Sequence, residues 1–216
     1  MLHLRKKSGT AVAAGIVLGM LGTGSGIAAQ IDLIHVTDRD DGYKIVFDAV
    51  IDAPASRVHK VLVDFANIGK INPDITDVSV GVAPTGRGEP RVRSVIESCV
   101  LFFCRHLVQV EDVTEPDPNT IVTTIVPGAG DFRSGSTLWR LTAEGPCTRT
   151  RLHYEATRVA GFWIPPLIGP WAVKSKMREQ LEYSILAVER LAKPDPGSLA
   201  ASPPAPGARA GAAELC

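Results

Sequence analysis

The chain has 216 residues, 23 basic and 23 acidic side chains, and 45% hydrophobic residues. This composition is typical of one globular domain with an apolar core, and it argues against an intrinsically disordered protein. A net charge of zero gives little electrostatic attraction for phosphate groups, so we expect no nucleic-acid partner.

The first 29 residues have the three-part pattern of a secretory signal peptide. Basic residues at Arg5–Lys7 precede an apolar stretch rich in Ala and Gly, and small residues follow near Ala28 and Ala29. We therefore expect an exported protein, with the bacterial periplasm as its compartment. The alternative is an inner-membrane anchor formed by residues 11–29, a stretch barely long enough to span about 30 Å of hydrocarbon.

Residues 43–73 predict a β-strand that is followed by two short helices. Apolar and polar side chains alternate in Tyr43–Ile51, which is the period-two pattern of a half-buried strand. Pro54 suits the first turn of the next helix, whose apolar residues recur at helical spacing up to Phe65. Pro73 ends the second helical turn, because the residue before a proline avoids the helical region.

Six further strands are expected between this unit and a long helix. They are Ile75–Val82, Arg91–Val100, His106–Thr114, Thr120–Val126, Gly135–Ala143 and Thr148–Val159. Turn-forming residues separate most of them and no helical pattern intervenes, so an antiparallel meander is predicted. The helix is expected over Pro170–Ala192, where apolar residues recur every three or four positions. At about 1.5 Å per residue it is long enough to cross a whole sheet.

The two ends of the chain are expected to lie outside the folded domain. Residues 193–216 are mostly Pro, Ala and Gly with few large apolar side chains, so we expect a disordered tail. With a leader over residues 1–29, the folded domain is predicted to cover residues 31–192, which is an ordinary size for one domain.

The order of strand, two short helices, six strands and a long helix resembles the START-like superfamily, also called SRPBCC or Bet v 1-like. The resemblance rests on VFDAVIDAPASRVHKVLVDFANIGKINPDI (residues 46–75) and on WAVKSKMREQLEYSILAVERL (residues 171–191). Within the superfamily the chain is most similar to the polyketide cyclase/dehydrase and lipid-transport group. The resemblance implies an α+β helix-grip fold, in which a curved antiparallel sheet of about seven strands holds the last helix over a pocket for an apolar ligand.

Nine residues are candidates for binding such a ligand. Two lie on strand faces that we expect to point inward, two at a hairpin tip, two in a Pro-rich loop before the long helix, and three on that helix. In this order they are Trp139 and Tyr154, Phe102 and Phe103, Phe162 and Trp163, and Trp171, Met177 and Leu181. Plain core packing is the alternative for the inward residues, and burial against the sheet is the alternative for the hairpin tip. For the Pro-rich loop, expected as a lid over the pocket entrance, the alternative is packing on the N-terminus of the long helix.

The cysteines predict one disulfide. Cys99 and Cys104 bracket the apolar hairpin tip, and in an exported protein this spacing favours a bond that closes the hairpin. The alternative is two unpaired cysteines, because the geometry of a disulfide across a turn is strict. The pairing of Cys147 and Cys216 stays open. The histidines and cysteines show no metal-ligand spacing, so no metal site is expected.

The charged residues of the strands are interpreted as surface residues. His153 alternates with Tyr154 and is expected on the solvated face. Arg93 and Glu97 share a face of their strand, and with Glu111 they are interpreted as a surface cross-strand ion pair. No nucleophile elbow, paired carboxylates or Cys–His pair is visible, so the sequence favours a binding protein over an enzyme.

The leading hypothesis is an exported protein that binds or transports a hydrophobic small molecule or lipid, with no cofactor. The first alternative is an enzyme of the polyketide cyclase or dehydratase type, acting on an aromatic or polyketide-like substrate by positioning it. The second alternative is a protein-interaction module. Transient contact with a membrane is a further expectation, and the sequence makes no prediction of the oligomeric state.

Overall fold

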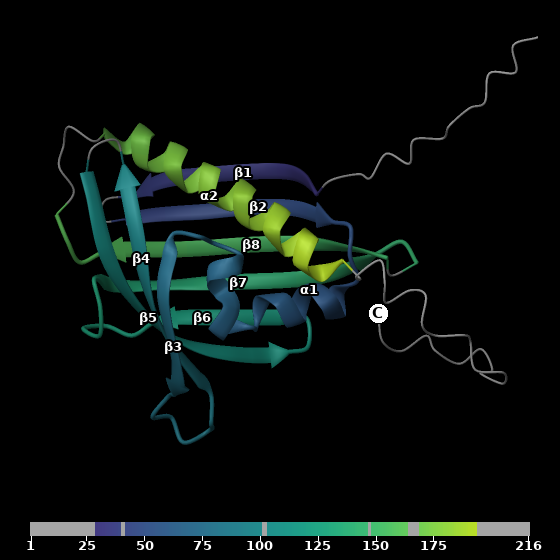
Figure 1. Ribbon diagram of the computed structural model, residues 1–216, viewed down its shortest axis with the longest axis horizontal. Helices are drawn as coiled ribbons and strands as arrows, with labels where there is room; N and C mark the ends of the chain where they lie inside the picture. The colour runs from purple at the N-terminus through teal and green to yellow at the C-terminus, as the bar shows by residue number, and fades with distance from the viewer. Residues whose placement is uncertain (1–28, 40–41, 101–102, 147, 164–168, 194–216) are drawn as a thin grey trace, which may run out of the picture.

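Eight antiparallel strands form one curved sheet in the computed structural model of the protein, which describes residues 29–39, 42–100, 103–146, 148–163 and 169–193 (Figure 1). The strand order across the sheet is β1-β2-β8-β7-β6-β5-β4-β3, so most neighbours in sequence are also neighbours in space. The strands are β1 (Gln30–Arg39), β2 (Gly42–Ile51), β3 (Ile75–Val82), β4 (Pro90–Val100), β5 (Phe103–Asp117), β6 (Thr120–Ile125), β7 (Phe132–Glu144) and β8 (Arg149–Ala160).

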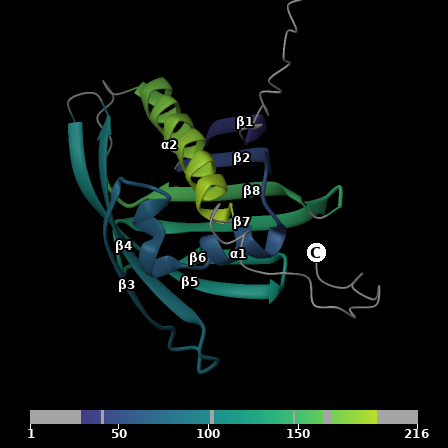
Figure 2. The ribbon, with the colours of Figure 1, turned by 45° about the vertical axis from the view of Figure 1, so that its right-hand side comes forward.

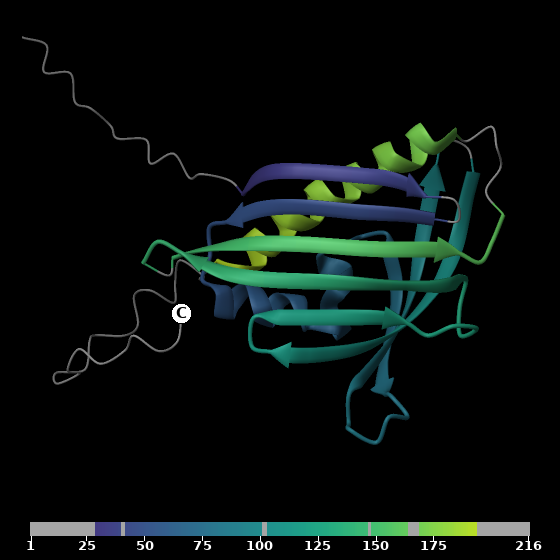
Figure 3. The ribbon, with the colours of Figure 1, turned by 180° about the vertical axis from the view of Figure 1, so that it is seen from behind.

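The helices lie on one face of this sheet. Helix α1 (Ala55–Leu62) and the 3-10 helix η1 (Phe65–Lys70) follow β2, and the long helix α2 (Gly169–Ala192) ends the described domain. Figure 2 shows α2 crossing the strands on the concave side, and Figure 3 shows that strands alone form the opposite side of the domain. This arrangement confirms the expected helix-grip fold.

Strand β1 is an additional strand that the sequence pattern did not predict. It pairs with β2 along its length, but a bulge shifts the register between Ile31 and Leu33. Beyond the bulge Ile34 faces Phe47, on the same side of the sheet as the pair of Ile31 and Ala49. The inward apolar residues of β1 are therefore not spaced by two throughout, and a period-two search misses them.

Helix α2 has two halves with different surroundings. In its C-terminal half Ile185, Val188 and Ala192 are fully buried in the core against β2 and α1. In its N-terminal half Val173 and Met177 are only half-buried. The helix is thus fixed at one end and stands over a less completely filled space at the other.

A buried carboxylate joins the end of α2 to the hinge after β2. Glu189 is 5% exposed, although it belongs to the polar positions of the helix. It accepts hydrogen bonds from the Asp52 backbone N–H (3.1 Å) and from Lys193 Nζ (2.7 Å). Nearby, the Thr150 hydroxyl donates to the Ala53 carbonyl at 2.6 Å. The hinge that sends the chain into α1 is therefore held by side chains from α2 and β8.

Several predicted features lie outside the described residues. They include most of the expected leader, nearly all of the tail, Cys147 and Cys216, and part of the hairpin tip. Within the described part of the chain, no helix has both the length and the apolar character that a membrane span needs.

Replacing the buried carboxylate should destabilise the domain. Glu189→Ala would leave the Asp52 N–H without its acceptor and remove a charge-assisted bond to Lys193, so we expect a loss of about 2–3 kcal/mol in the free energy of unfolding. Urea denaturation at neutral pH measures this loss. Glu182→Ala, at an exposed position of the same helix, is the control and should change stability by less than about 0.5 kcal/mol. Equal effects of the two substitutions would contradict the anchoring role.

Candidate functional site

A cavity of about 360 Å³ lies between the concave face of the sheet and helix α2. Residues of β2, β4, β5, β6, β7 and β8 line the sheet side, η1 closes another side, and α2 covers it. Most of the lining is apolar, including Leu62, Phe65 and Ile68 from the short helices. Its size and apolar character suit a small hydrophobic molecule.

Three aromatic rings stand in a row on the sheet side of the cavity. Strand register sets the row, because Tyr154 of β8 faces Phe47 of β2 on one side and Trp139 of β7 on the other. The rings of Phe47 and Tyr154 are stacked, with centroids 4.8 Å apart and 27° between their planes. The rings of Trp139 and Tyr154 meet edge to face, with centroids 4.4 Å apart. This aromatic row offers flat apolar surface to a ligand.

A buried ion pair interrupts the apolar lining. Glu111 of β5 accepts a hydrogen bond from Arg158 of β8 at 2.7 Å, and both side chains line the cavity with little exposure. Thr123 donates to the same Glu111 oxygen at 2.7 Å, and Gln109 donates to the other oxygen at 2.8 Å. Both carboxylate oxygens therefore have partners, as a charge in an apolar site requires.

Both terminal nitrogens of the Arg158 guanidinium also have hydrogen-bond partners. Its Nη2 donates to Glu111 and to the Thr137 hydroxyl (2.8 Å), while Nη1 donates to the backbone carbonyls of Ser136 and Thr157 at 3.1 and 2.9 Å. The pair adds no net charge to the cavity, because one positive and one negative side chain satisfy each other. Its contribution is a set of polar groups held at fixed positions in the cavity wall.

The Tyr154 phenol lies beside this pair. The Tyr154 side chain is partly buried and lines the cavity. Burial raises the pKa of Tyr154, and the nearby Glu111 charge acts in the same direction, whereas Arg158 and a hydrogen bond with Thr137 act against it. Tyr154 is therefore neutral over the physiological range and can donate or accept a hydrogen bond at the cavity wall.

One end of the cavity lies at the hairpin of β4 and β5. Phe162 packs edge-to-face on Phe132 with centroids 6.0 Å apart, and the Arg105 guanidinium stands 4.9 Å from the Phe162 ring. All three residues line the cavity together with Ser98. This end brings a cation and aromatic rings together, which stabilise each other.

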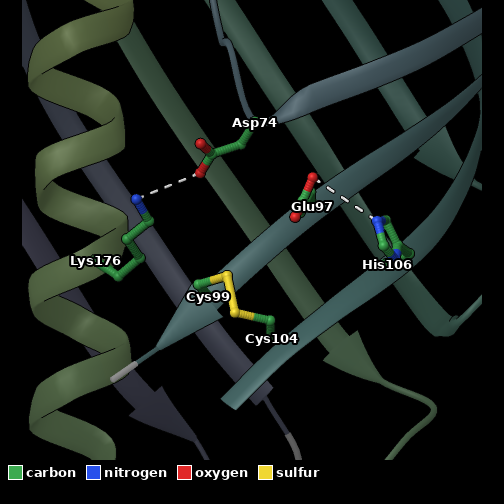
Figure 4. The surroundings of a disulfide bond; sticks show 6 residues. All are labelled: Asp74, Glu97, Cys99, Cys104, His106 and Lys176. Atoms are coloured by element: carbon green, nitrogen blue, oxygen red, sulfur yellow. Dashed lines mark ion pairs between the residues drawn. A yellow bond between two sulfur atoms is a disulfide. The ribbon is translucent and has the colours of Figure 1, made fainter. Parts of the chain in front are cut away.

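A disulfide closes the hairpin at this end and confirms the predicted bond. Cys99 and Cys104 face each other in the register of β4 and β5, and their Cα atoms are 4.0 Å apart. Figure 4 shows the bond near Lys176 of α2, whose ammonium lies 3.4 Å from the Asp74 carboxylate. Gln180 of α2 also hydrogen-bonds Asp74. The same region thus ties α2 to the chain just before β3.

The nine predicted ligand residues fall into three groups. Five line the cavity, and they are Trp139, Tyr154, Phe162, Met177 and Leu181. Trp163 and Trp171 are each 68% exposed and are not among the lining residues, so their side chains face solvent rather than the cavity. Phe102 and the Phe103 side chain lie outside the described part of the structure. Binding by the five lining residues remains a prediction.

The interpretation of Glu111 as a surface residue is wrong. Arg93 does form a surface pair, but with Asp77 at 3.1 Å, and Glu97 lies 3.8 Å from His106. Glu111 faces the buried Val92 instead and therefore points into the cavity. The sequence holds a signal for its partner, since Arg158 continues the inward series of Tyr154 and Ala156 at intervals of two.

His153 lies on the outer face of the sheet, as predicted. It faces Asp48 in the register of β2 and β8, and its Nδ1 is 2.9 Å from the Asp48 carboxylate. It has no access to the cavity from that face. Within the described residues, no group of three or more His, Cys, Asp or Glu side chains is placed to hold a metal ion.

Comparison with known proteins identifies relatives of this fold. A family model described as polyketide cyclase / dehydrase and lipid transport matches residues 43–183. No curated protein sequence matches the chain.

Several solved structures share the fold of this chain. A START superfamily protein of Mycobacterium smegmatis is 22% identical with a TM-score of 0.54, over 69% of this chain and 96% of that one. A protein of Thermus thermophilus is 19% identical with a TM-score of 0.56, over 74% and 99% of the two chains. The Zhui aromatase/cyclase of Streptomyces sp. R1128 is 19% identical with a TM-score of 0.53, over 73% and 94%. Identities this low show a common fold and nothing further.

The Tyr154 phenol should make the domain less stable at alkaline pH. Because the pKa is raised in the folded state, only the unfolded chain loses this proton as the pH first rises above about 10. The contribution of Tyr154 is complete below that pH and is lost as the pH climbs toward the raised value. The free energy of unfolding should therefore fall less steeply above about pH 10 in Tyr154→Phe than in the wild type.

Urea denaturation over a series of alkaline buffers measures this slope. Tyr183→Phe, which removes an exposed phenol from α2, should keep the wild-type slope. If wild type and both variants lost stability equally with pH, the phenol of Tyr154 would not be the buried group described.

Proposed function

Because the chain belongs to the polyketide cyclase / dehydrase and lipid transport family, we propose that it binds or carries a hydrophobic small molecule or lipid in the cavity under α2. The cavity is the observation that carries the proposal, since side chains of the sheet and of α2 leave about 360 Å³ between them. Apolar lining disfavours water in such a space, and an apolar ligand that replaces water gains the hydrophobic free energy of its own burial.

The site favours binding over catalysis. Catalysis on a cyclase-type substrate would need a group free to exchange a proton with it. Both oxygens of Glu111 already accept hydrogen bonds from Arg158, Thr123 and Gln109. The carboxylate is thereby committed to its neighbours, and its role in the proposal is to fix polar geometry.

A polyketide cyclase or dehydratase activity is the second candidate. Glu111 favours it in one respect, because a carboxylate buried in the cavity lining is uncommon in a simple apolar carrier. Tyr154 would serve as a hydrogen-bond donor to a carbonyl of the substrate. Product analysis with an aromatic polyketide precursor separates the two candidates, since a carrier returns the precursor unchanged.

We also propose that the protein is exported. The basic and apolar leader pattern of residues 1–29 supports export, and so does the Cys99–Cys104 disulfide, because such bonds persist in oxidising compartments. A carrier in the periplasm would hold an apolar molecule away from water between membranes.

Filling the cavity should prevent ligand uptake. Leu181→Trp adds bulk to a residue that lines the cavity under α2, so the affinity for the apolar fluorescent probe N-phenyl-1-naphthylamine should fall at least about tenfold. Fluorescence titration measures the affinity, and thermal unfolding checks that the variant folds. The control is Leu186→Trp, the same substitution on the exposed face of the same helix, which should bind as the wild type does. Wild-type affinity in both variants would place binding elsewhere.

Export is tested by the mass of the mature protein. When the full chain is produced in a bacterium, the periplasmic fraction should contain a species lacking about the first 29 residues, as intact mass spectrometry would show. Ala29→Arg replaces a small residue at the expected cleavage site with a large charged one, so this variant should accumulate as the longer form. Recovery of the full-length chain with the membrane fraction would favour the anchor, and its recovery in the cytoplasm would contradict export.

A further inference from the structure

A strip of polar side chains crosses the apolar floor of the cavity. Ser94 of β4 faces Gln109 of β5, and Thr123 of β6 faces Thr137 of β7. Glu111 connects the two pairs through its hydrogen bonds with Gln109 and Thr123. The polar strip therefore runs over four neighbouring strands, and all five side chains line the cavity.

Ser94 differs from the rest of the strip. It is only 6% exposed, yet its hydroxyl makes no hydrogen bond with any residue that the structure describes. No fully enclosed polar side-chain atom in the described domain lacks a partner, so the Ser94 oxygen must keep open surface, and the open surface available to it is the cavity. A hydroxyl that opens on the cavity and bonds no protein group is available to a ligand.

Gln109, which faces Ser94 on the neighbouring strand, has hydrogen-bonding groups that the protein leaves unused. One N–H of its amide donates to Glu111, which fixes the orientation of the side chain. The amide oxygen and the second N–H have no partner among the described residues. A Ser hydroxyl and a Gln amide together can donate to and accept from one small polar group.

We infer that Ser94 and Gln109 form a subsite for one uncharged polar group, a hydroxyl or a carbonyl, of an otherwise apolar ligand. This inference rests on the proposed function, because it names the chemical class of the ligand that the cavity takes. The ligand lies with its polar group on the strip and its apolar body against the aromatic row of Phe47, Tyr154 and Trp139.

The charges around the subsite exclude an ionic group. Glu111 and Arg158 neutralise each other, and both terminal nitrogens of Arg158 are already donating to protein acceptors. A ligand carboxylate at Ser94 would stand near the Glu111 carboxylate, whereas Arg105, the other arginine that lines the cavity, lies at the hairpin end. An ammonium group would lose its water in an apolar wall where both Glu111 oxygens are occupied, and that loss is unfavourable.

Ser98 offers a second hydroxyl on the same face of β4. It lines the cavity at the hairpin end, four residues along β4 from Ser94 and facing Arg105. At about 3.3 Å per residue, it lies roughly 13 Å from the subsite.

Three naphthalenes test the inference on the purified protein. They are naphthalene, 2-naphthol and 2-naphthoate, which share a skeleton and carry no polar group, a neutral hydroxyl and a carboxylate. Their affinities are measured by calorimetric titration at neutral pH. We expect 2-naphthol to bind wild type about fivefold or more tighter than naphthalene, the effect of one hydrogen bond, and 2-naphthoate to bind most weakly.

Ser94→Ala should remove the preference for 2-naphthol and leave the affinity for naphthalene unchanged. Its midpoint of urea denaturation should stay close to that of wild type, because the substitution removes no hydrogen bond between described residues. The matched control is Ser98→Ala, the same substitution on the same face of β4 near the hairpin end, which should keep the preference.

The outcomes separate the inference from the proposed function. Binding of all three compounds without a preference for 2-naphthol, or a preference that survives Ser94→Ala, overturns the subsite while the apolar cavity stands. Equal weakening of naphthalene and 2-naphthol in Ser94→Ala would show a structural role and would also overturn it. Failure of wild type to bind any of the three overturns the proposed function and the subsite with it.

Discussion

The structure depends on how one long helix is fixed. Helix α2 is clamped at its C-terminal end, where Ile185 and Val188 enter the core and Glu189 holds the hinge after β2. Toward its N-terminus the helix is tied to Asp74 through Lys176 and Gln180. Supported at these two places, α2 spans a curved sheet whose inward side chains do not reach it everywhere, and the cavity is the space that remains. An unfilled apolar space costs stability, so a fold that keeps one is expected to use it.

The polarity of the cavity follows from the same sheet. Because successive strand residues alternate between faces, each inward position adds one side chain to the floor, and register decides which of them meet. Tyr154 meets two aromatic neighbours, whereas Arg158 on the same strand reaches Glu111 across β7 and β6. A cavity of this kind combines a flat apolar wall with a small fixed polar region, which allows it to discriminate ligands by one polar group rather than by size alone.

Much of the fold could be predicted from the sequence, because period two and helical spacing are local signals. Strand β2, the meander and α2 are of this kind, and so is the inward orientation of Trp139 and Tyr154. Strand β1 could not be found in this way, because its bulge breaks the period. The polar part of the site was not predicted from the sequence for another reason. Charged residues such as Glu111 are expected to be exposed unless the strand register that turns them inward is known.

We propose that the cavity under α2 takes up an apolar molecule with one neutral polar group. Native mass spectrometry of the protein purified under mild conditions from the cells that make it, followed by solvent extraction, tests this proposal. We expect a bound species of discrete added mass that organic solvent extracts and that carries a hydroxyl or carbonyl but no ionised group. A protein that carries no such species and also fails to take up apolar compounds in titration would contradict it.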